Sequence, residues 1–248
     1  MTTPKERVRL AAIGDLHCPR TSPETWRVVF SHVMPHADIL LLCGDLTDHG
    51  LPEEAHLLAE EVAAQVSIPI LAVLGNHDYE AGKSDEVRTI LSTAGVVILD
   101  GDACEVHGIG FAGVKGFAGG FGQSALQPWG EEAIKAFVRE GVDEALKLES
   151  ALAQLRTPQR VAVLHYAPIR DTVVGEAPEI FPFLGSSRLE EPLNRYAVTA
   201  AFHGHAHQGS LEGRTTGGTA VYNVAAPLLQ ARSPDRPPFY VVEIPLAP

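Results

Sequence analysis

Short, almost entirely apolar runs recur along the chain, and each is followed directly by a cluster of polar residues. The runs occupy positions 8–14, 38–43, 68–74, 160–164 and 197–202. Runs of this length that do not alternate with polar residues are typical of strands that are covered on both faces. The pattern therefore predicts a buried β-sheet whose strands deliver polar residues at their carboxyl ends.

Other stretches repeat apolar residues every three or four positions, which is the period of a helix that packs one face on a sheet. The predicted helices are 52–65, 84–93, the long stretch from 128 to 155, and 189–196. Pro52 with Glu53 favours the start of the first helix. In the longest stretch, Gly141 predicts a break into two helices. Antiparallel strands are predicted near the end of the sequence, at 210–224 and 239–244.

The alternation of strands and helices predicts an α/β fold, and 248 residues fit a single domain that spans 1–248. Hydrophobic residues make up 45% of the chain and charged residues 20%, which is ordinary globular usage and argues against disorder. The apolar runs are far too short to span a bilayer. We therefore expect no membrane segment.

Charge and cysteine content limit the expected partners and the expected cellular location. The net charge of −12 repels polyanions over most of the surface, so a nucleic-acid partner is disfavoured, whereas a small anionic substrate is compatible with locally placed cations. Cys18, Cys43 and Cys104 are widely spaced and form no CxxC pair, which fits a reducing compartment. No apolar leader opens the sequence, so we expect a cytoplasmic location. The oligomeric state is left open, a homodimer included.

Chemistry-bearing side chains gather at the ends of the five apolar runs. The donors delivered there are Asp15, His17, Asp45, Asn76, His165, His205 and His207. Ligands of α/β sheets collect at the carboxyl ends of strands, and imidazole is a common ligand of transition metals. Seven oxygen and nitrogen donors are too many for one tetrahedral ion and include too few carboxylates for a calcium cage. They suit two adjacent divalent ions that share a carboxylate.

The order and spacing of these residues resemble the pattern of one family. The motifs are D-x-H at 15–17, G-D-x-x-D-x-G at 44–50, G-N-H-D at 75–78, a histidine at 165 and G-H-x-H at 204–207. In this order they resemble the motifs of the calcineurin-like metallophosphoesterases, over residues 8 to 207. The resemblance implies a four-layer αββα sandwich of two mixed β-sheets flanked by helices, with a dinuclear metal site at its edge.

The resemblance also implies which residues hold the two ions. The ligands of the first ion are expected to be Asp15, His17, Asp45 and His207. The ligands of the second are expected to be Asp45, Asn76, His165 and His205. Asp45 would then bridge the two ions. Asp78 is expected to support the loop or a neighbouring ligand rather than to act directly. Histidine and carboxylate donors suit manganese, iron and zinc alike, and manganese or iron is the expectation.

Four residues besides the metal ligands are candidates for the chemistry or for substrate binding. His77 is expected at the substrate, where it would donate a hydrogen bond or protonate the leaving alkoxide, with Asp48 orienting it. The amide of Asn76 is expected to stabilise charge on the phosphate as well. Arg170 is a candidate phosphate contact, and His203 is expected to support a ligand or to face the substrate.

Two clamped ions lower the pKa of a shared water and hold the oxygens of an in-line displacement. We therefore expect a phosphoester hydrolase in which a metal-bridging hydroxide attacks phosphorus. The segment His165-Tyr166-Ala167-Pro168 resembles the His-x-x-Pro segment of the small-phosphodiester branch, which favours a phosphodiesterase on small substrates. A phosphomonoesterase or nucleotidase, and a metal-binding scaffold with weak catalysis, are the alternatives. A nuclease is disfavoured by the acidic balance.

Overall fold

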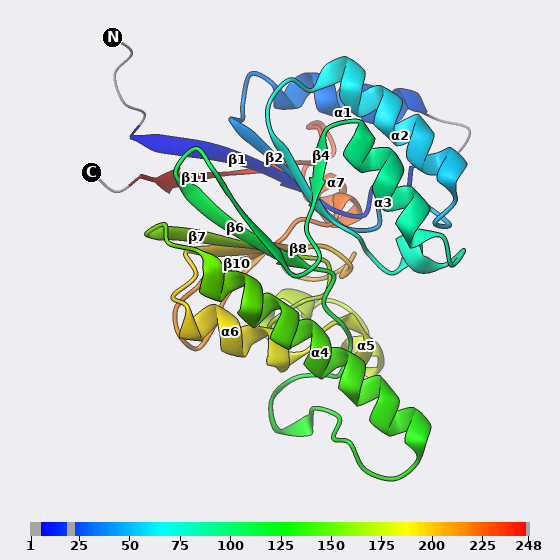
Figure 1. Cartoon of the computed structure of the whole chain (residues 1–248), viewed down its shortest axis with the longest axis vertical. Helices are drawn as coiled ribbons and strands as arrows, with labels where there is room; N and C mark the ends of the chain where they lie inside the picture. Colours follow the sequence, from blue (N-terminus) through cyan, green and yellow to red (C-terminus); the bar gives the residue numbers. More distant parts are fainter. Residues whose placement is uncertain (1–5, 19–22, 247–248) are drawn as a thin grey trace.

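The computed structural model describes residues 6–18 and 23–246, which form two β-sheets packed face to face with helices on both outer faces (Figure 1). The first sheet has the strand order β11-β1-β2-β3-β4. Its strands are β1 (Arg7–Ile13), β2 (Ile39–Cys43), β3 (Ile70–Val73), β4 (Val96–Ile98) and β11 (Tyr240–Pro245). Strand β11 runs antiparallel to β1, whereas the other pairs are parallel.

The second sheet has the strand order β5-β6-β7-β8-β10-β9. Its strands are β5 (Asp102–Val106), β6 (Ile109–Val114), β7 (Gln159–Leu164), β8 (Ala200–His203), β9 (Glu212–Arg214) and β10 (Ala220–Asn223). The four central strands are parallel and the two edge strands are antiparallel to their neighbours. The expected sandwich of two mixed sheets between helical layers is confirmed.

Helices cover the outer face of each sheet (Figure 1). The helices over the first sheet are α1 (Pro23–Val33), α2 (Pro52–Gln65) and α3 (Ser84–Thr93). The helices over the second sheet are α4 (Glu132–Gln154) and α6 (Glu190–Arg195). The remaining two lie in connections and are α5 (Phe181–Leu184) and α7 (Ala226–Arg232).

Strand β2 shows why the central runs are apolar throughout. Leu40 and Leu42 pack under the helices of the first sheet, whereas Leu41 points between the two sheets. There it shares an apolar layer with Phe111 and Phe202 of the second sheet, and all five side chains are fully buried. Side chains alternate across a strand, so a strand buried on both faces needs apolar residues at every position.

The predicted secondary structure differs from the structure in the helices. Helix α4 is continuous, so the expected break at Gly141 is wrong. A Cβ at Gly141 would lie 3.1 Å from the main-chain oxygen of Ala118, which shows that this glycine allows the preceding loop to approach the helix. Helices α1, α5 and α7 were not predicted. In the described part of the chain, no helix has the length and apolar character needed to cross a membrane.

Candidate metal centre

The carboxyl ends of five parallel strands bring the predicted donors together at one edge of the sandwich. Asp15 and His17 follow β1, Asp45 follows β2, Asn76 follows β3 and His165 follows β7, while His205 and His207 follow β8. Three sets of possible ligand atoms each lie within 4.8 Å of one another. These sets are Asp15 with His17 and His207, Asp45 with His165 and His205, and His17 with Asp45 and His77.

The carboxylate of Asp45 belongs to the second of these sets and also faces the first. Its Oδ2 atom is 3.8 Å from Nε2 of His17, and its Oδ1 atom is 3.4 Å from Nε2 of His165. Burial and the nearby charge of Asp15 raise the pKa of Asp45 to about 6 in the metal-free chain. One oxygen of this carboxylate therefore faces each set, which is the arrangement that a bridging ligand needs.

His165 and Asn76 direct two lone pairs at each other. Nδ1 of His165 donates to the main-chain oxygen of Cys43 over 2.9 Å. Burial lowers the pKa of His165, so the ring is neutral and its Nε2 atom carries a lone pair. That atom is 2.9 Å from Oδ1 of Asn76, which is also an acceptor. Two acceptors at this distance are favourable when a cation lies against both, as neighbouring ligands of one metal ion do.

His17 gives a second sign that a cation belongs in this site. Both of its ring nitrogens are buried, and neither forms a hydrogen bond within the described chain. Buried polar atoms are almost always hydrogen-bonded, so a nitrogen left without a partner needs an explanation. In the second set, Nε2 of His205 donates to the main-chain oxygen of Phe183 over 3.1 Å, which leaves Nδ1 with its lone pair. The donor set therefore fits divalent metal ions.

Asp15 is held in its charged form at the opposite side of the site. It is fully buried, which alone would raise its pKa, but the hydrogen bond from His207 and the charges of neighbouring histidines lower that pKa overall. Nε2 of His207 lies 2.9 Å from Oδ1 of Asp15. The main-chain N–H of His205 donates to the same carboxylate. Asp15 thus remains ionised and connects the loop after β1 with the loop after β8.

The main chain is strained at four of the predicted metal ligands and closely packed at two glycines. The donors with left-handed backbone are Asp15 (φ 57°), His17 (φ 41°), Asp45 (φ 48°) and His205 (φ 70°). Such angles are uncommon outside glycine and gather at functional sites. A Cβ at Gly75 would lie 2.2 Å from Oδ1 of Asp45, and one at Gly204 would lie 2.3 Å from Oδ2 of Asp15. The carboxylates therefore occupy the space that side chains would need.

Asp78 holds two loops of the site in place, which confirms the expectation that it supports the loop around Asp45. Its carboxylate accepts hydrogen bonds from the N–H groups of Leu46, Thr47 and Gly75, and from the Thr47 hydroxyl at 2.6 Å. The side chain is fully buried. It acts as a brace between the loop after β2 and the loop after β3.

The contact between His77 and Asp48 differs from the expected one. Nδ1 of His77 donates to the main-chain oxygen of Asp48 over 2.7 Å, whereas the Asp48 carboxylate lies 3.4 Å from Nδ1 of His17 and 3.3 Å from Nε2 of His49. Burial of His77 lowers its pKa, but this hydrogen bond and the charges of Asp45 and Glu80 raise it overall. The main chain of Asp48 therefore orients His77, whereas its carboxylate lies beside His17 and His49.

Two of the predicted substrate contacts lie outside this cluster. His203 is fully buried; its Nε2 atom lies 2.8 Å from the Thr172 hydroxyl and its Nδ1 atom 2.8 Å from the main-chain oxygen of Gly204. Both ring nitrogens thus have protein partners, which favours support over a direct contact with substrate. Arg170 is exposed and lies over the ring of Phe181, with 5.7 Å to its centroid. It lines a separate cavity of about 410 Å³ with Asp171 and Glu190.

Comparison with known proteins decides the family. The family model of the calcineurin-like phosphoesterases matches residues 8–209, which is most of the chain. The chain belongs to the calcineurin-like phosphoesterase family. This phosphoesterase is therefore a metal-dependent hydrolase of phosphoric esters, of a family that uses a dinuclear metal site and acts on small phosphoesters. No curated protein sequence matches the chain significantly.

Solved structures share the fold of this calcineurin-like phosphoesterase at low sequence identity. The phosphopantetheinyl hydrolase PptH from Mycobacterium tuberculosis is 17% identical, with a TM-score of 0.68 over 96% of both chains. The protein TT1561 of Thermus thermophilus is 12% identical, with a TM-score of 0.56 over 95% of this chain and 98% of that one. A putative 5′-nucleotidase from Staphylococcus aureus is 14% identical, with a TM-score of 0.55 over 88% of this chain and 48% of its own.

Several groups that shape the site of this phosphoesterase were not predicted. The main-chain oxygens of Cys43, Asp48 and Phe183 fix the ring orientations of three histidines. A carbonyl group is present in every residue, so no sequence signal distinguishes these three. The hydroxyl of Thr172, which meets His203, also lies far from it in the sequence. Only the fold brings such partners together.

Proposed function

We propose that this phosphoesterase is a phosphodiesterase that holds two divalent ions and acts on small substrates. The observation that carries the proposal is the position of the Asp45 carboxylate, which presents one oxygen to each of two donor sets. The proposed ligands of the first ion are Asp15, His17, Asp45 and His207. The proposed ligands of the second ion are Asp45, Asn76, His165 and His205.

When bound, two divalent ions supply the positive charge that lowers the pKa of a water and stabilises the attacked phosphate. The chain positions the other groups. The His77 ring is part exposed and lies edge-on to His17, with 4.5 Å between the ring centroids. Since its Nδ1 atom is held by the Asp48 carbonyl, its Nε2 atom is the one that can meet the substrate. We assign His77 to donate a hydrogen bond to the phosphate and to protonate the leaving alkoxide.

The metal preference follows from the donors. The site combines imidazole nitrogens, carboxylates and one amide oxygen, with no thiolate among the proposed ligands. Such donors suit manganese and iron, and zinc is compatible with them as well. We propose manganese or iron as the resident ions, with occupancy decided by availability rather than by affinity alone.

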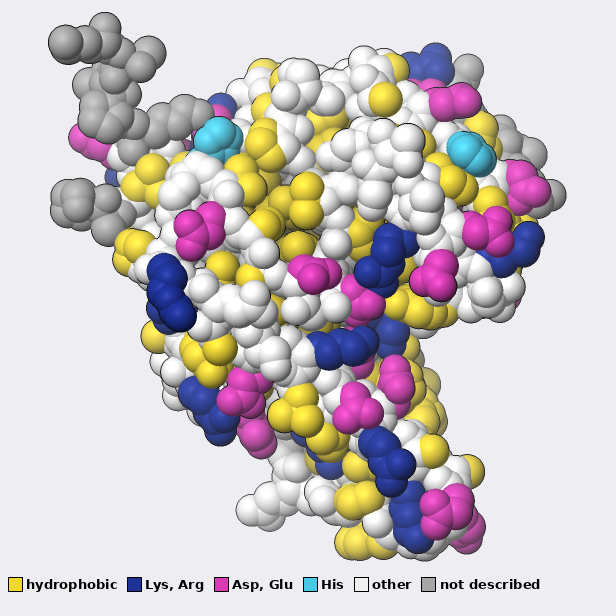
Figure 2. Space-filling model, in the orientation of Figure 1, with side chains coloured by type: hydrophobic (Ala, Val, Ile, Leu, Met, Phe, Trp, Pro, Cys, Tyr) yellow, Lys and Arg dark blue, Asp and Glu magenta, His cyan; other side chains and the backbone are white. Residues whose placement is uncertain are grey.

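The preference for a diester rests on the surroundings of the site. A diester carries an organic group on two ester oxygens, and the side of the centre formed by Asp15 and His17 opens into a cavity of about 800 Å³ with largely apolar walls. On the face shown in Figure 2, basic and acidic side chains are interspersed and form no continuous basic stripe. With a net charge of −12, this pattern supports a small substrate over a polynucleotide.

Cysteine chemistry supports the proposed location. Cys18 and Cys43 are buried and Cys104 is half-buried, and all three are free thiols. Free thiols persist in reducing compartments, so we propose that the protein works in the cytoplasm. A homodimer is compatible with this proposal.

Turnover of two chromogenic esters tests the proposed activity. Protein loaded with manganese should hydrolyse bis-(p-nitrophenyl) phosphate with a higher kcat/KM than p-nitrophenyl phosphate, and Asp45→Asn should abolish both activities. A preference for the monoester would replace the phosphodiesterase by a phosphomonoesterase or nucleotidase. Turnover of neither ester above the level of Asp45→Asn, together with fewer than two bound ions, would indicate a metal-binding scaffold.

A further inference from the structure

A cavity leads away from the metal centre and meets a second cavity that carries two arginines. We infer that the substrate of this hydrolase is an extended phosphoester, in which an apolar segment links the scissile phosphate to a second anionic group. The inference rests on the proposed function, because it assumes that the scissile phosphate binds at the two-ion centre. It specifies which alcohol the enzyme recognises.

The first cavity begins at the metal centre itself. Asp15 and His17 form one end of it, and its volume is about 800 Å³. Its further walls come from α1, through Trp26 and Val28, and from α7 with the segment that follows it, through Pro227. Val28 is 55% exposed, although it is a large apolar side chain. An apolar chain that leaves the scissile phosphate on this side would cover these side chains and remove them from water.

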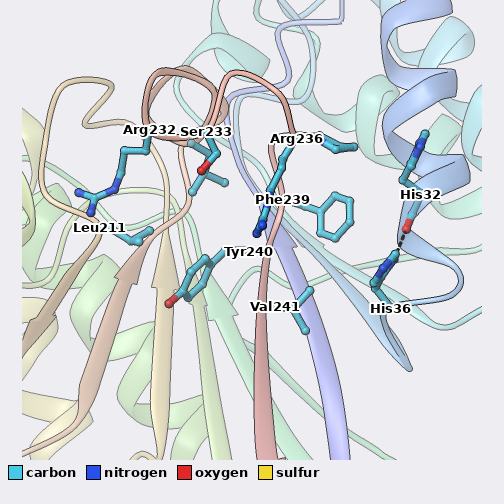
Figure 3. A pocket seen from close by; sticks show the side chains of 11 residues that line it. His32, His36, Leu211, Arg232, Ser233, Arg236, Phe239, Tyr240 and Val241 are labelled. Carbon is cyan, nitrogen blue, oxygen red and sulfur yellow. Dashed lines mark hydrogen bonds between the residues drawn. The ribbon is translucent and has the colours of Figure 1, made fainter.

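The second cavity lies next to the first. The two share His32, Arg236 and Pro237 in their walls, so they are adjacent in space. The second has a volume of about 510 Å³ and adds Arg232 and His36. Figure 3 shows both arginines on α7 and the segment after it, opposite His32 of α1 and His36 of the turn that follows α1.

The arginines supply positive charge in a chain that is otherwise acidic. The net charge is −12, yet Arg232 and Arg236 are exposed and form no ion pair with any carboxylate of the described residues. Besides Asp15, the first cavity has one other carboxylate in its wall, that of Asp235. His32 and His36 donate from Nδ1 to the main-chain oxygens of Val28 and His32, both in α1. Two guanidinium groups without a carboxylate partner, one in the shared wall and one in the second cavity, favour an anionic group beside them.

The side chains that line the two cavities set the chemistry of the ligand. Asp15, His17 and apolar side chains line the first cavity, Arg236 lines both cavities, and Arg232 lines the second. A phosphoester of a short, polar alcohol would leave both the apolar walls and the arginines uncovered. A phosphate or carboxylate joined to the scissile phosphate through an apolar linker would contact all three regions.

Binding of non-hydrolysable ligands tests this inference without requiring turnover. The probes are n-alkylphosphonates and α,ω-alkane bisphosphonates of matched length, titrated calorimetrically into the manganese-loaded protein. Affinity of the monophosphonates should rise by roughly two- to fourfold for each methylene that lies against the apolar walls. At the length that reaches the arginines, the bisphosphonate should bind roughly tenfold more tightly than the matched monophosphonate, beyond the statistical factor of about two.

Matched variants locate the two effects. In Arg232→Gln/Arg236→Gln, the ratio of bisphosphonate to monophosphonate affinity should fall to the statistical factor. The control is Arg139→Gln, which removes an exposed arginine of α4 and should preserve the ratio. Val28→Asn should reduce the gain in affinity per methylene, whereas Val142→Asn, at an exposed valine of α4, should not.

The outcomes separate this inference from the proposed activity. A ratio near the statistical factor in the wild type at every length, or no effect of the arginine substitutions on it, overturns the inference even where bis-(p-nitrophenyl) phosphate is hydrolysed. If the ratio is high and depends on the arginines, but no phosphodiester is hydrolysed, the extended binding site stands and the proposed activity fails. If the gain in affinity per methylene is the same in Val28→Asn as in the wild type, the assignment of the apolar wall is wrong.

Discussion

Nδ1 of His165 lies 2.9 Å from the main-chain oxygen of Cys43, and this hydrogen bond joins the last residue of β2 in the first sheet to the loop after β7 in the second. It fixes the ring so that Nε2 faces the Oδ1 atom of Asn76 and the carboxylate of Asp45. Main-chain partners that fix the tautomer of a histidine ligand are a common feature of metal sites. The packing of the two sheets therefore sets the orientation of a proposed ligand.

Replacing Asn76 should empty one of the two proposed metal positions. Asn76→Ala removes the oxygen that faces Nε2 of His165, so the second ion loses one of four ligands. We expect metal content to fall towards one ion per chain and kcat to fall by roughly 100-fold. Elemental analysis and steady-state kinetics measure both. Asn194→Ala, at a side chain that bonds Thr216 away from the site, serves as the control, and two tightly bound ions in Asn76→Ala would contradict the assignment.

The three neighbouring histidines should differ in their effects. His205→Ala and His207→Ala remove proposed ligands and should abolish turnover. His203→Ala should retain partial activity but lower the free energy of unfolding by about 1 to 3 kcal/mol, because it removes one of the two partners of the buried Thr172 hydroxyl and leaves the Gly204 oxygen without the His203 ring. Urea unfolding and kinetics on the same preparations compare the three. Complete loss of turnover in a folded, metal-loaded His203→Ala protein would assign this residue a direct role.

Substitution of His77 should cost more activity than substitution of Asp48. His77→Ala removes the proposed proton donor, and we expect kcat to fall by roughly 100- to 1,000-fold while two ions stay bound. Asp48→Asn keeps the main-chain oxygen that holds His77 and should lower kcat by at most about tenfold. Single-turnover kinetics with metal analysis measure the difference. Equal losses would show that the Asp48 carboxylate itself takes part.

Acid should weaken the fold through Asp100, far from the metal centre. Burial raises the pKa of Asp100, but hydrogen bonds and charges from Arg88 and Lys147 lower it overall from its ordinary value of 3.8. A carboxyl group with a lower pKa in the folded state stabilises the fold above its unfolded-state pKa, and this contribution is lost as pH falls through the folded-state value.

The test compares the metal-free wild type with Asp100→Asn. Their difference in free energy of unfolding should be constant above about pH 5 and should shrink below about pH 4. Urea midpoints at several pH values measure it. A difference that does not change with pH would show that the ion pairs with Arg88 and Lys147 contribute nothing at this position.

The polar residues at strand ends could be predicted because strand position and side-chain chemistry are both local properties of a sequence. The apolar runs before Asp15, Asp45 and His165 locate the ends of their strands, and parallel strands end at one edge. Helix α1 was also accessible from the sequence, since Trp26, Val29, Phe30 and Val33 follow a helical period. This pattern indicates a helix, and the structure has one there.

Other features could not be predicted because they depend on contacts distant in the sequence. Gly141 has the same local signature whether it ends a helix or makes room for a loop, and only the approach of Ala118 distinguishes the two. Whether Asp48 meets His77 through its carboxylate or through its main-chain oxygen depends on how the loops after β2 and β3 approach each other in the fold. The cavity whose wall includes Asp15 and Arg236 is likewise formed by α1, α7 and the segment after α7, and no sequence motif predicts it.

Asp15 and His207 are 192 residues apart in sequence and 2.9 Å apart in space. An ion held by both would join the loop after β1 in the first sheet to the loop after β8 in the second. It would therefore act on the folded chain as a removable crosslink. Ligands that bind only the folded state stabilise it in proportion to the logarithm of their concentration. The resistance of this protein to unfolding would then follow the metal supply of its surroundings, so that scarcity of metal reduces not only the activity of each molecule but also the number of molecules that stay folded.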